Sequence, residues 1–477
     1  MRRIMKFGGT SVANADVVCK AAEIIKQYHD AGDELVVVVS AQRGVTDAIM
    51  KTASELLHRY DEKGISELLA DLSTRHLTAL KGAAPSHYEE VRIVIEHRIE
   101  NLGNLLRAIY YLKELTPRSY DYVSSFGERL NVPIISACLC EMGVPSTALD
   151  ACQAGVLTTR SHGDAVALPA GEERIRDHLL PLITGKGGKT GENPIVPVIT
   201  GFMGCTEDGA VTTLGRGGSD YSASIIGAAL DADEIWIWTD VDGIMTTDPR
   251  LVENARVIEE LSYIEVMELS YFGAKVMHSR SIEPAMQKSI PVFVKNTFHP
   301  DALGTVISAG NHRDTRVVKA ITYIEKVATV TVAGAQMIGR PGVAKFIFSS
   351  LAEAQVNVMM ISQGSSEANI TIVIDEDQAE RAKECLFPLT QQCMVREVLV
   401  DRNVCAVAVV GSGMSGAHGT AGRTFSALGS AGINVMMISQ GSSEVNISFV
   451  VQGDQGAHAV HVLHEEFELA HAEGEIR

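Results

Sequence analysis

The chain lacks a long hydrophobic run, an excess of basic residues and any C-x-x-C pair of cysteines. None of its segments approaches the roughly 18 consecutive apolar residues that cross a bilayer, and no apolar stretch follows Arg2 and Arg3 as it would in a secretory signal. The eight cysteines are scattered without a C-x-x-C pair, which excludes a small disulfide framework and favours a reducing compartment. We therefore expect a cytoplasmic protein with no membrane partner.

The charge balance disfavours a second class of partners. Lys and Arg number 41 against 59 Asp and Glu, so the formal net charge is −18 and nonspecific binding to nucleic acid is not expected. Any anionic substrate must therefore meet locally placed cations. The length of 477 residues and the hydrophobic content of 46% are sufficient for two or three domains with their own cores.

Two glycine-rich loops place cations next to predicted helix starts. Lys6 precedes Gly8 and Gly9 in the first loop, and Arg216 lies among three glycines at 215–218 in the second. Each loop lies between an apolar run and a helical pattern, so the unpaired N–H groups of a helix N-terminus would join the cation. One such loop alone is more often an ordinary turn. Two of them favour a ligand that carries several negative charges.

Apolar, β-branched runs alternate with helical patterns as far as about residue 306. We predict strands at 35–39, 122–124, 146–148, 195–200, 234–238 and 291–294, and helices at 15–29, 129–142, 219–230 and 263–287. Residues 48–116 have an almost wholly helical pattern and read as an inserted helical pair. This alternation predicts a parallel or mixed sheet covered by helices.

An acidic loop at 238–250 follows the predicted strand 234–238. Ligands of open α/β sheets bind beyond the carboxyl ends of strands, so this loop has the right position for a nucleotide. Because Asp, Gly and Pro also favour turns, an ordinary surface turn is an equal alternative on these residues alone.

A direct repeat begins beyond residue 320. Residues 357–367 return unchanged as 434–444, and the similarity extends without gaps in both directions. Each copy has a βαββα pattern, which predicts helices on one face of an antiparallel sheet, and two copies are too few for a solenoid. The first copy has a candidate last strand at 395–400 and the second has none. Whether a swapped or inserted strand completes the second copy stays open.

Five segments resemble, in order, the signature of the aspartate kinases: 6–11, 124–128, 215–221, 240–250 and 273–275. The resemblance spans the whole chain and implies an α/β amino-acid kinase fold, a sheet covered by helices on both faces, at residues 1–306 with 48–116 as a helical insertion. It also implies two βαββαβ ACT-like α+β domains, at 320–401 and 402–477. Met245 and Ser279 depart from residues common in that family, with changed nucleotide affinity as the largest expected effect.

The resemblance implies transfer of a phosphoryl group from ATP, with Mg²⁺, to the side-chain carboxylate of L-aspartate, at the head of lysine, threonine and methionine synthesis. It implies catalytic roles for Lys6 and Asp220. The implied substrate-binding residues are Ser40, Thr46, Glu128, Arg216 and Ser219. The implied ATP-binding residues are Lys6, Gly8, Gly9, Thr239, Asp240, Asp248, Arg250 and Lys275. Glu128 as a helix cap and Lys275 as a solvated helix residue are the alternatives for those two.

The repeat implies feedback regulation by an end-product amino acid and a homodimer or higher oligomer formed through the ACT-like domains. The form of 362–367 resembles threonine-responsive members slightly more than lysine-responsive ones, so threonine is favoured over lysine. The candidate effector-binding residues are Asn357, Ser362, Gln363, Asn434, Ser439 and Gln440.

Two other functions are open on the sequence, and a metal site is disfavoured by its spacing. A different amino-acid or carbamate kinase of the same fold would keep the glycine loops but lack the pairing of Arg216 with Glu128. A catalytically silent amino-acid sensor would use the repeat alone. His458, His461 and His464 could suggest a metal site, but steps of three residues drift around a helix, so a hydrated or packed face is favoured.

Overall fold

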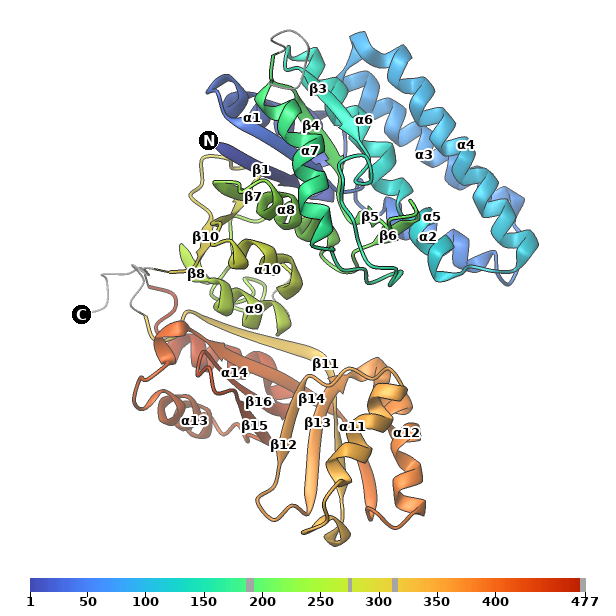
Figure 1. Ribbon diagram of the computed structural model, residues 1–477. Coiled ribbons are helices and arrows are strands. Elements are labelled where there is room, and N and C mark those ends of the chain that lie inside the picture. Colours follow the sequence, from blue (N-terminus) through green and yellow to red (C-terminus); the bar gives the residue numbers. More distant parts are fainter. Residues whose placement is uncertain (186–192, 273–276, 311–315, 472–477) are drawn as a thin grey trace. The chain divides into compact units, whose positions relative to one another are not determined.

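The computed structural model describes residues 1–185, 193–272, 277–310 and 316–471 (Figure 1). Contacts divide the chain into two compact units, of which the first contains 1–244, 259–263 and 277–311. The second contains 245–258, 264–276 and 312–477. Two segments inside the range 1–306 therefore group with the C-terminal unit. Lys275, with its motif 273–275, lies outside the described residues.

An eight-stranded sheet forms the centre of the first unit, in the order β3-β4-β2-β1-β7-β9-β10-β8. Neighbours from β3 to β9 run parallel, whereas β10 runs antiparallel to β9. Long buried runs on β2 and β4 fit strands that helices cover on both faces. The bounds are β1 Arg2–Phe7, β2 Glu34–Val39, β3 Ser146–Leu149, β4 Val196–Thr200, β7 Glu234–Thr239, β8 Glu260–Ser262, β9 Val292–Asn296 and β10 Thr305–Ser308.

Helices α1, α6 and α8 correspond to predicted helices, whereas α7 was not predicted. The insertion predicted as a helical pair contains three helices, α2, α3 and α4, and it packs into the same core as α1, α6 and the sheet. Asn14 caps α1 by accepting a hydrogen bond from the N–H of Val17. The bounds are α1 Ala15–Asp30, α2 Val45–Glu55, α3 Glu62–Ala83, α4 Tyr88–Leu112, α5 Pro117–Ser124, α6 Phe126–Glu141, α7 Ala170–Thr184, α8 Gly218–Ala229 and α10 Ser279–Gln287.

Two predictions for this region need correction. Residues 122–124 are not a strand but the last residues of α5, because Thr116 caps that helix and Pro117 is its first residue. The single helix predicted at 263–287 is two helices, α9 (Tyr263–Tyr271) and α10, with 273–276 outside the described residues. The sequence also gave no sign of the hairpin of β5 (Met203–Cys205) and β6 (Val211–Thr213).

The second unit contains a six-stranded antiparallel sheet in the order β12-β13-β11-β14-β16-β15. Each copy of the repeat shows the predicted βαββα order. The first copy comprises β11 Ala320–Ala333, α11 Val343–Glu353, β12 Met360–Gln363, β13 Asn369–Asp375 and α12 Ala379–Gln391. The second comprises β14 Glu397–Val410, α13 Thr420–Ser430, β15 Met437–Gln440, β16 Asn446–Gln452 and α14 Gly456–Glu466.

The long strands β11 and β14 show how the second copy of the repeat is completed. The first part of β11, Ala320 to Ile324, pairs with the second part of β14, and the last part of β11 pairs with the first part of β14. Each long strand therefore serves both copies, and the second copy obtains its missing strand from a segment that precedes the first copy. Separate hydrophobic cores lie under α11 with α12 and under α13 with α14.

No helix in the described ranges combines the length and apolar character needed to cross a bilayer.

Candidate functional site

A cleft of about 360 Å³ lies in the first unit, where the carboxyl ends of β1 and β2 meet the start of α8. Such a position beyond parallel strand ends is where ligands of open α/β sheets bind. All the side chains predicted for catalysis and substrate binding line this cleft: Lys6, Ser40, Thr46, Glu128, Arg216, Ser219 and Asp220.

Three helices begin at the cleft. Thr46 lies in the first turn of α2, Glu128 in that of α6, and Ser219 and Asp220 in that of α8. The first N–H groups of a helix have no partner within it and carry a partial positive charge. Gly127 allows a close approach, because a Cβ there would lie 2.6 Å from Thr46 Oγ1. This arrangement supplies a local attraction for anions in a chain of net charge −18.

Lys6 and Asp220 form an ion pair in the cleft, with 2.5 Å between Lys6 Nζ and Asp220 Oδ1. Both residues are more than nine-tenths buried. The carboxylate holds the ammonium at the end of β1 while the remaining N–H donors of the lysine can meet a ligand.

The loop before α8 presents Arg216 between two glycines. Gly215 and Gly217 have φ values of +74° and +71°, a conformation that favours glycine. Arg216 is exposed, and among the described residues no carboxylate forms an ion pair with it. Its planar guanidinium can therefore bind a ligand carboxylate through two hydrogen bonds.

Glu128 is a buried carboxyl group with an unsatisfied oxygen. Its Oε1 accepts a hydrogen bond from the N–H of Ala41 at 3.2 Å, and its Oε2 has no hydrogen-bond partner. Burial raises the pKa of Glu128 to about 8. An ammonium group entering the cleft would satisfy the open oxygen and favour the ionised form. This bond links Glu128 of α6 to Ala41 in the loop after β2.

The first glycine loop has less freedom than its sequence suggests. The N–H of Gly8 donates to the carbonyl of Trp238 at 3.0 Å, so it would have to leave that bond to contact a phosphate. A Cβ on Gly9 would lie 2.6 Å from the carbonyl oxygen of Ala41, so only glycine fits there. Thr239 is the last residue of β7, the parallel neighbour of β1, and Asp240 follows it. These four residues thus lie at adjacent strand ends, and their contact with ATP stays a prediction.

The remaining nucleotide residues do not all belong to the first unit. Asp248 and Arg250 lie in the second unit and pair with each other at 2.5 Å between Asp248 Oδ2 and Arg250 Nη2. Lys275 lies outside the described residues.

The cleft also contains side chains that the sequence analysis missed. Gln42 is 2% exposed and its Nε2 has no hydrogen-bond partner, so it offers a donor toward a ligand. Phe202 adopts a φ of +67°, and a Cβ on Gly218 would lie 2.8 Å from its ring. Arg43 and Asp47 also line the cleft. Their positions after β2 and β4 are the signal that could have identified them.

The predicted effector-binding residues lie mostly at the edges of the second unit's sheet. Ser362 and Gln363 are on β12 and Ser439 and Gln440 on β15, and these two edge strands approach each other. Asn434 is exposed in the segment before β15. The N–H of Asn357 donates to Gln378 Oε1 at 3.0 Å.

The histidines of α14 form no described metal site. His464 is buried, with its Nε2 at 3.0 Å from Thr246 Oγ1, and burial lowers its pKa. The residues that the structure describes contain no group of three or more His, Cys, Asp or Glu able to hold a metal ion.

Comparison with known proteins gives matches along almost the whole chain. A model of the amino acid kinase family matches residues 1–296, and a model of the ACT domain matches 330–387 and 407–467. Aspartokinase 1 of Arabidopsis thaliana, a chloroplastic protein, is 33% identical over 479 aligned positions, which cover 97% of this chain and 80% of that protein. The chloroplastic bifunctional aspartokinase/homoserine dehydrogenase 2 of the same plant is also 33% identical, and the match covers 98% of this chain but 51% of that relative.

Solved structures show the same likeness. Escherichia coli aspartokinase III in complex with aspartate and ADP has a TM-score of 0.81 at 28% identity, covering 98% of this chain and 99% of that one. The same enzyme in complex with lysine and aspartate has a TM-score of 0.77 at 29% identity, with the same coverage. This chain thus spans the length of a solved aspartokinase and about half the length of the bifunctional relative.

Proposed function

Because this chain belongs to the aspartate kinase family, we propose that it transfers the γ-phosphoryl group of ATP to the side-chain carboxylate of L-aspartate. The product is 4-phospho-L-aspartate, at the first step of lysine, threonine and methionine synthesis. The observation that carries the proposal is the meeting of a buried carboxyl group, an unpaired guanidinium and a buried lysine in one cleft.

The cleft offers a partner for each charge of aspartate. Glu128 receives the ammonium, since its Oε2 is buried without a partner. Arg216 binds the α-carboxylate, for which its exposed guanidinium has the matching geometry. Ser40, Thr46 and Ser219 line the same cleft and provide hydroxyl groups for further hydrogen bonds. The side-chain carboxylate is left to face the phosphoryl donor.

The phosphoryl transfer step itself requires little chemistry from the protein side chains. An oxygen of the aspartate carboxylate forms a bond to the γ-phosphorus while the bond from that phosphorus to the β–γ bridging oxygen breaks, and ADP leaves with the electron pair. The carboxylate is already ionised, so no general base is needed, and positioning with charge stabilisation does the work. Lys6 stabilises the charge on the transferred group, and Asp220 holds Lys6 in place.

Magnesium enters with the nucleotide in this proposal. Mg²⁺ is commonly held by one or two carboxylates together with substrate phosphates, so a cage made only of protein ligands is not required. Asp220, which lies in the cleft beside Lys6, would hold the ion, and the ion would supply charge neutralisation on the phosphates.

A panel of acidic substrates tests the proposal. We expect ADP release with magnesium-ATP to depend on L-aspartate and not on glutamate, asparagine or carbamate. We also expect hydroxylamine to trap the acyl phosphate as aspartyl hydroxamate. Turnover with carbamate or another amino acid instead would favour a different kinase of the same fold. No turnover with any acid, together with tight amino-acid binding, would favour the silent sensor.

Regulation forms the second part of the proposal. An end-product amino acid binds the ACT-like repeat and favours a state with a poorer kinase site, and threonine is favoured over lysine as that effector. Escherichia coli aspartokinase III has been solved with lysine, so both amino acids must be titrated. We expect Gln363→Ala or Gln440→Ala to weaken inhibition at unchanged uninhibited turnover, whereas Gln391→Ala, at the exposed end of α12, leaves inhibition intact. Inhibition that neither substitution weakens would contradict this part.

The organisation of the chain completes the proposal. Residues 1–306 form the catalytic domain, and 320–401 and 402–477 form the regulatory ACT-like domains, which the matched ranges 1–296, 330–387 and 407–467 support. The sharing of β11 and β14 supports interleaved rather than simply tandem regulatory domains. A homodimer or higher oligomer through these domains and a cytoplasmic location are proposed on the family resemblance and the scattered cysteines.

A further inference from the structure

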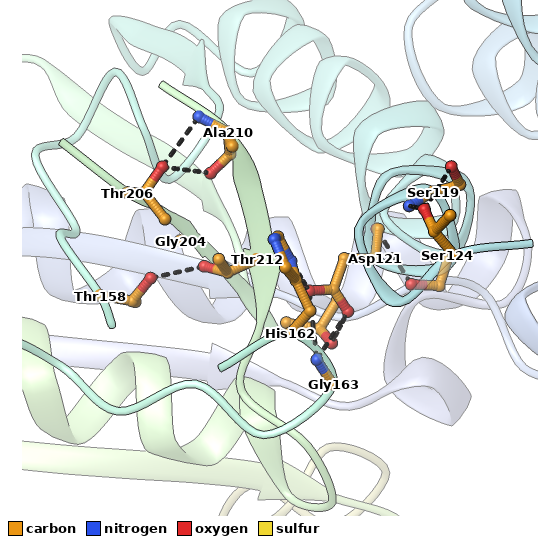
Figure 2. Close-up of polar contacts among 12 residues, drawn as sticks. Ser119, Asp121, Ser124, Thr158, His162, Gly163, Gly204, Thr206, Ala210 and Thr212 are labelled. Atoms are coloured by element: carbon orange, nitrogen blue, oxygen red, sulfur yellow. Dashed lines mark hydrogen bonds and ion pairs between the residues drawn. The ribbon is translucent and has the colours of Figure 1, made fainter. Parts of the chain in front are cut away.

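Asp121 is a fully buried carboxylate outside the cleft, and its hydrogen-bond donors come from the turn at 161–165 and from the last residue of β6. Thr213 Oγ1 donates to its Oδ1 at 2.5 Å, and the N–H of Gly163 donates to the same oxygen at 3.0 Å. His162 Nδ1 lies 2.6 Å from Oδ2 and must carry the proton there, because a carboxylate only accepts (Figure 2). Asp121 is 0% exposed. Burying a carboxylate costs free energy unless such bonds compensate, so this cluster is a specific arrangement rather than chance packing.

The three donors tie together the elements that lead into the Arg216 loop. Thr213 ends β6, two residues before Gly215. Its carbonyl accepts a hydrogen bond from the N–H of Ala165 at 2.9 Å, so the turn at 161–165 is bound to Thr213 as well as to Asp121. The carboxylate therefore joins α5, the turn and the strand from which the loop emerges.

The turn packs directly on the first glycine of the loop. A Cβ on Gly215 would lie 3.0 Å from Asp164 Oδ1 and 3.3 Å from the carbonyl oxygen of Gly163. Because the turn packs so closely, the backbone at Gly215 has little room to move, and its φ of +74° favours glycine there. A shift of the turn would reach Gly215 and, through it, Arg216.

Helix α10 holds the other end of the loop. Ser281 Oγ donates to the carbonyl of Gly217 at 3.1 Å, and a Cβ on Gly217 would lie 2.6 Å from His278 Cβ. Arg280 of the same helix pairs with Asp164 of the turn, with 3.1 Å between Nη2 and Oδ2. Arg216 is thus the exposed residue between two glycines, of which one packs against the turn and the other against α10.

We propose that Asp121 is a positioning residue for substrate binding: its buried carboxylate fixes the turn at 161–165 against Thr213 and Gly215, and thereby sets the place of the Arg216 guanidinium. The proposal rests on the proposed function, in which Arg216 binds the α-carboxylate of aspartate. Asp121 touches no substrate and acts only through the loop.

The alternative is that Asp121 contributes only to the stability of the fold. Substitutions of two neighbouring threonines distinguish this role from the proposed positioning role. Thr213→Val removes the donor to Asp121 and keeps the shape of the side chain, and Thr213→Ser restores the hydroxyl. Thr212→Val is the matched control. Thr212 is equally buried on the same strand, but its Oγ1 pairs with Thr158 Oγ1 at 2.6 Å, away from Asp121.

The test is the steady-state KM for aspartate in these variants. We expect Thr213→Val to raise it roughly tenfold or more, as small displacements of a binding group do. Turnover number and the KM for ATP should change less than about twofold. Thr213→Ser and Thr212→Val should keep the wild-type KM for aspartate. Asp121→Asn should act like Thr213→Val if it folds, and the threonine variants suffice if it does not.

A double variant decides whether the effect passes through Arg216. In an Arg216→Ala background we expect Thr213→Val to leave the KM for aspartate unchanged, because the group it positions is absent. An equal rise in both backgrounds, or an equal rise with Thr212→Val, would overturn the proposal. If the wild-type protein phosphorylates aspartate and Thr213→Val has the wild-type KM for aspartate, this inference alone is overturned. Wild-type protein that does not use aspartate overturns the proposed function with it.

Discussion

Glu128 must change its ionisation when substrate enters the cleft. Burial raises its pKa to about 8, so below that pH the empty site holds mostly the protonated acid. An ammonium binds the carboxylate, so aspartate binding must release a proton. We expect kcat/KM for aspartate to rise with pH by up to about tenfold per unit toward pH 8 and then to level off. Initial rates at saturating ATP between about pH 6 and 9 measure this profile.

Glu128→Gln provides the control for this profile. The amide cannot ionise, so kcat/KM should be lower by roughly tenfold to a hundredfold and should lose the rise toward pH 8. A wild-type profile that is flat over this range, or a variant that keeps the slope, would assign the titration to another group.

Lys6 provides a different prediction, because its proposed role belongs to the transfer step. Lys6→Ala should lower kcat by on the order of a hundredfold or more while the KM for aspartate changes only a few-fold. Steady-state kinetics with both substrates varied makes the separation. Equal losses in turnover and in aspartate binding would contradict the role, as would a loss confined to the KM for aspartate.

Among individual residues, the sequence was more informative about charged groups than about neutral ones. Lys6, Glu128 and Arg216 stand in glycine-containing or helix-start segments and could be named in advance, and the structure brings them to one cleft. Gln42 was not named, because the position of an uncharged side chain after a strand is a weak signal until its burial and its unpaired Nε2 are known. Asp121 is charged but was also missed, because its partners at 162–163 and 213 are distant in the sequence.

At the scale of elements, the loop into α8 depends on glycines whose conformation other residues adopt at a cost. Gly217→Ala would combine a φ of +71° with a Cβ only 2.6 Å from His278 Cβ. We expect it to lower the free energy of unfolding by more than the roughly 1–2 kcal/mol of the backbone term, and to raise the KM for aspartate by displacing Arg216. Thermal unfolding and steady-state kinetics measure the two effects.

Gly209→Ala is the matched control for this change. Its φ is +81°, but no atom lies within 4 Å of the added Cβ, so it carries the backbone cost without the collision. It should leave the KM for aspartate at the wild-type value. The same KM in both variants would show that the loop tolerates the collision and that Arg216 is held in another way.

The strands were predictable where the sequence contains a long apolar run. The runs at 35–39, 195–200 and 234–238 fall within one residue of β2, β4 and β7. The short run at 122–124 misled, because three residues cannot distinguish a strand from a helix end and the cap at Thr116 with Pro117 was the stronger signal. The completion of the second repeat was not predictable, since it depends on the long-range register of β11 with β14.

At the scale of the molecule, the second unit is built partly from the middle of the chain. Val252 belongs to the core under α13 and α14, and Glu265 of α9 forms a fully buried pair with Lys319, at 3.4 Å between Oε2 and Nζ. Removing one member of a buried ion pair takes away the opposite charge that offsets the burial of the other member. Lys319→Met should therefore destabilise the second unit by roughly 3–5 kcal/mol. Calorimetry of the full-length variant should show the unfolding transition of the second unit at a lower temperature than in the wild type.

Lys326→Met is the control on the same long strand, where the lysine is exposed. It should change stability by less than about 0.5 kcal/mol. Equal unfolding temperatures in the two variants would show that the buried pair contributes nothing to stability, and that other contacts hold α9 to the C-terminal residues.

The central claim is that this cleft binds aspartate through Arg216 for phosphorylation by ATP. The most direct test is the aspartate concentration dependence of aspartyl hydroxamate formation by wild-type protein, by Arg216→Ala and by the surface control Arg92→Ala, whose side chain pairs with Glu96 on α4. We predict saturable product formation by the wild type and by Arg92→Ala, and a KM for aspartate at least about tenfold higher in Arg216→Ala at an unchanged KM for ATP. A wild-type KM in Arg216→Ala, or no aspartate-dependent product from any of the three, would contradict the account.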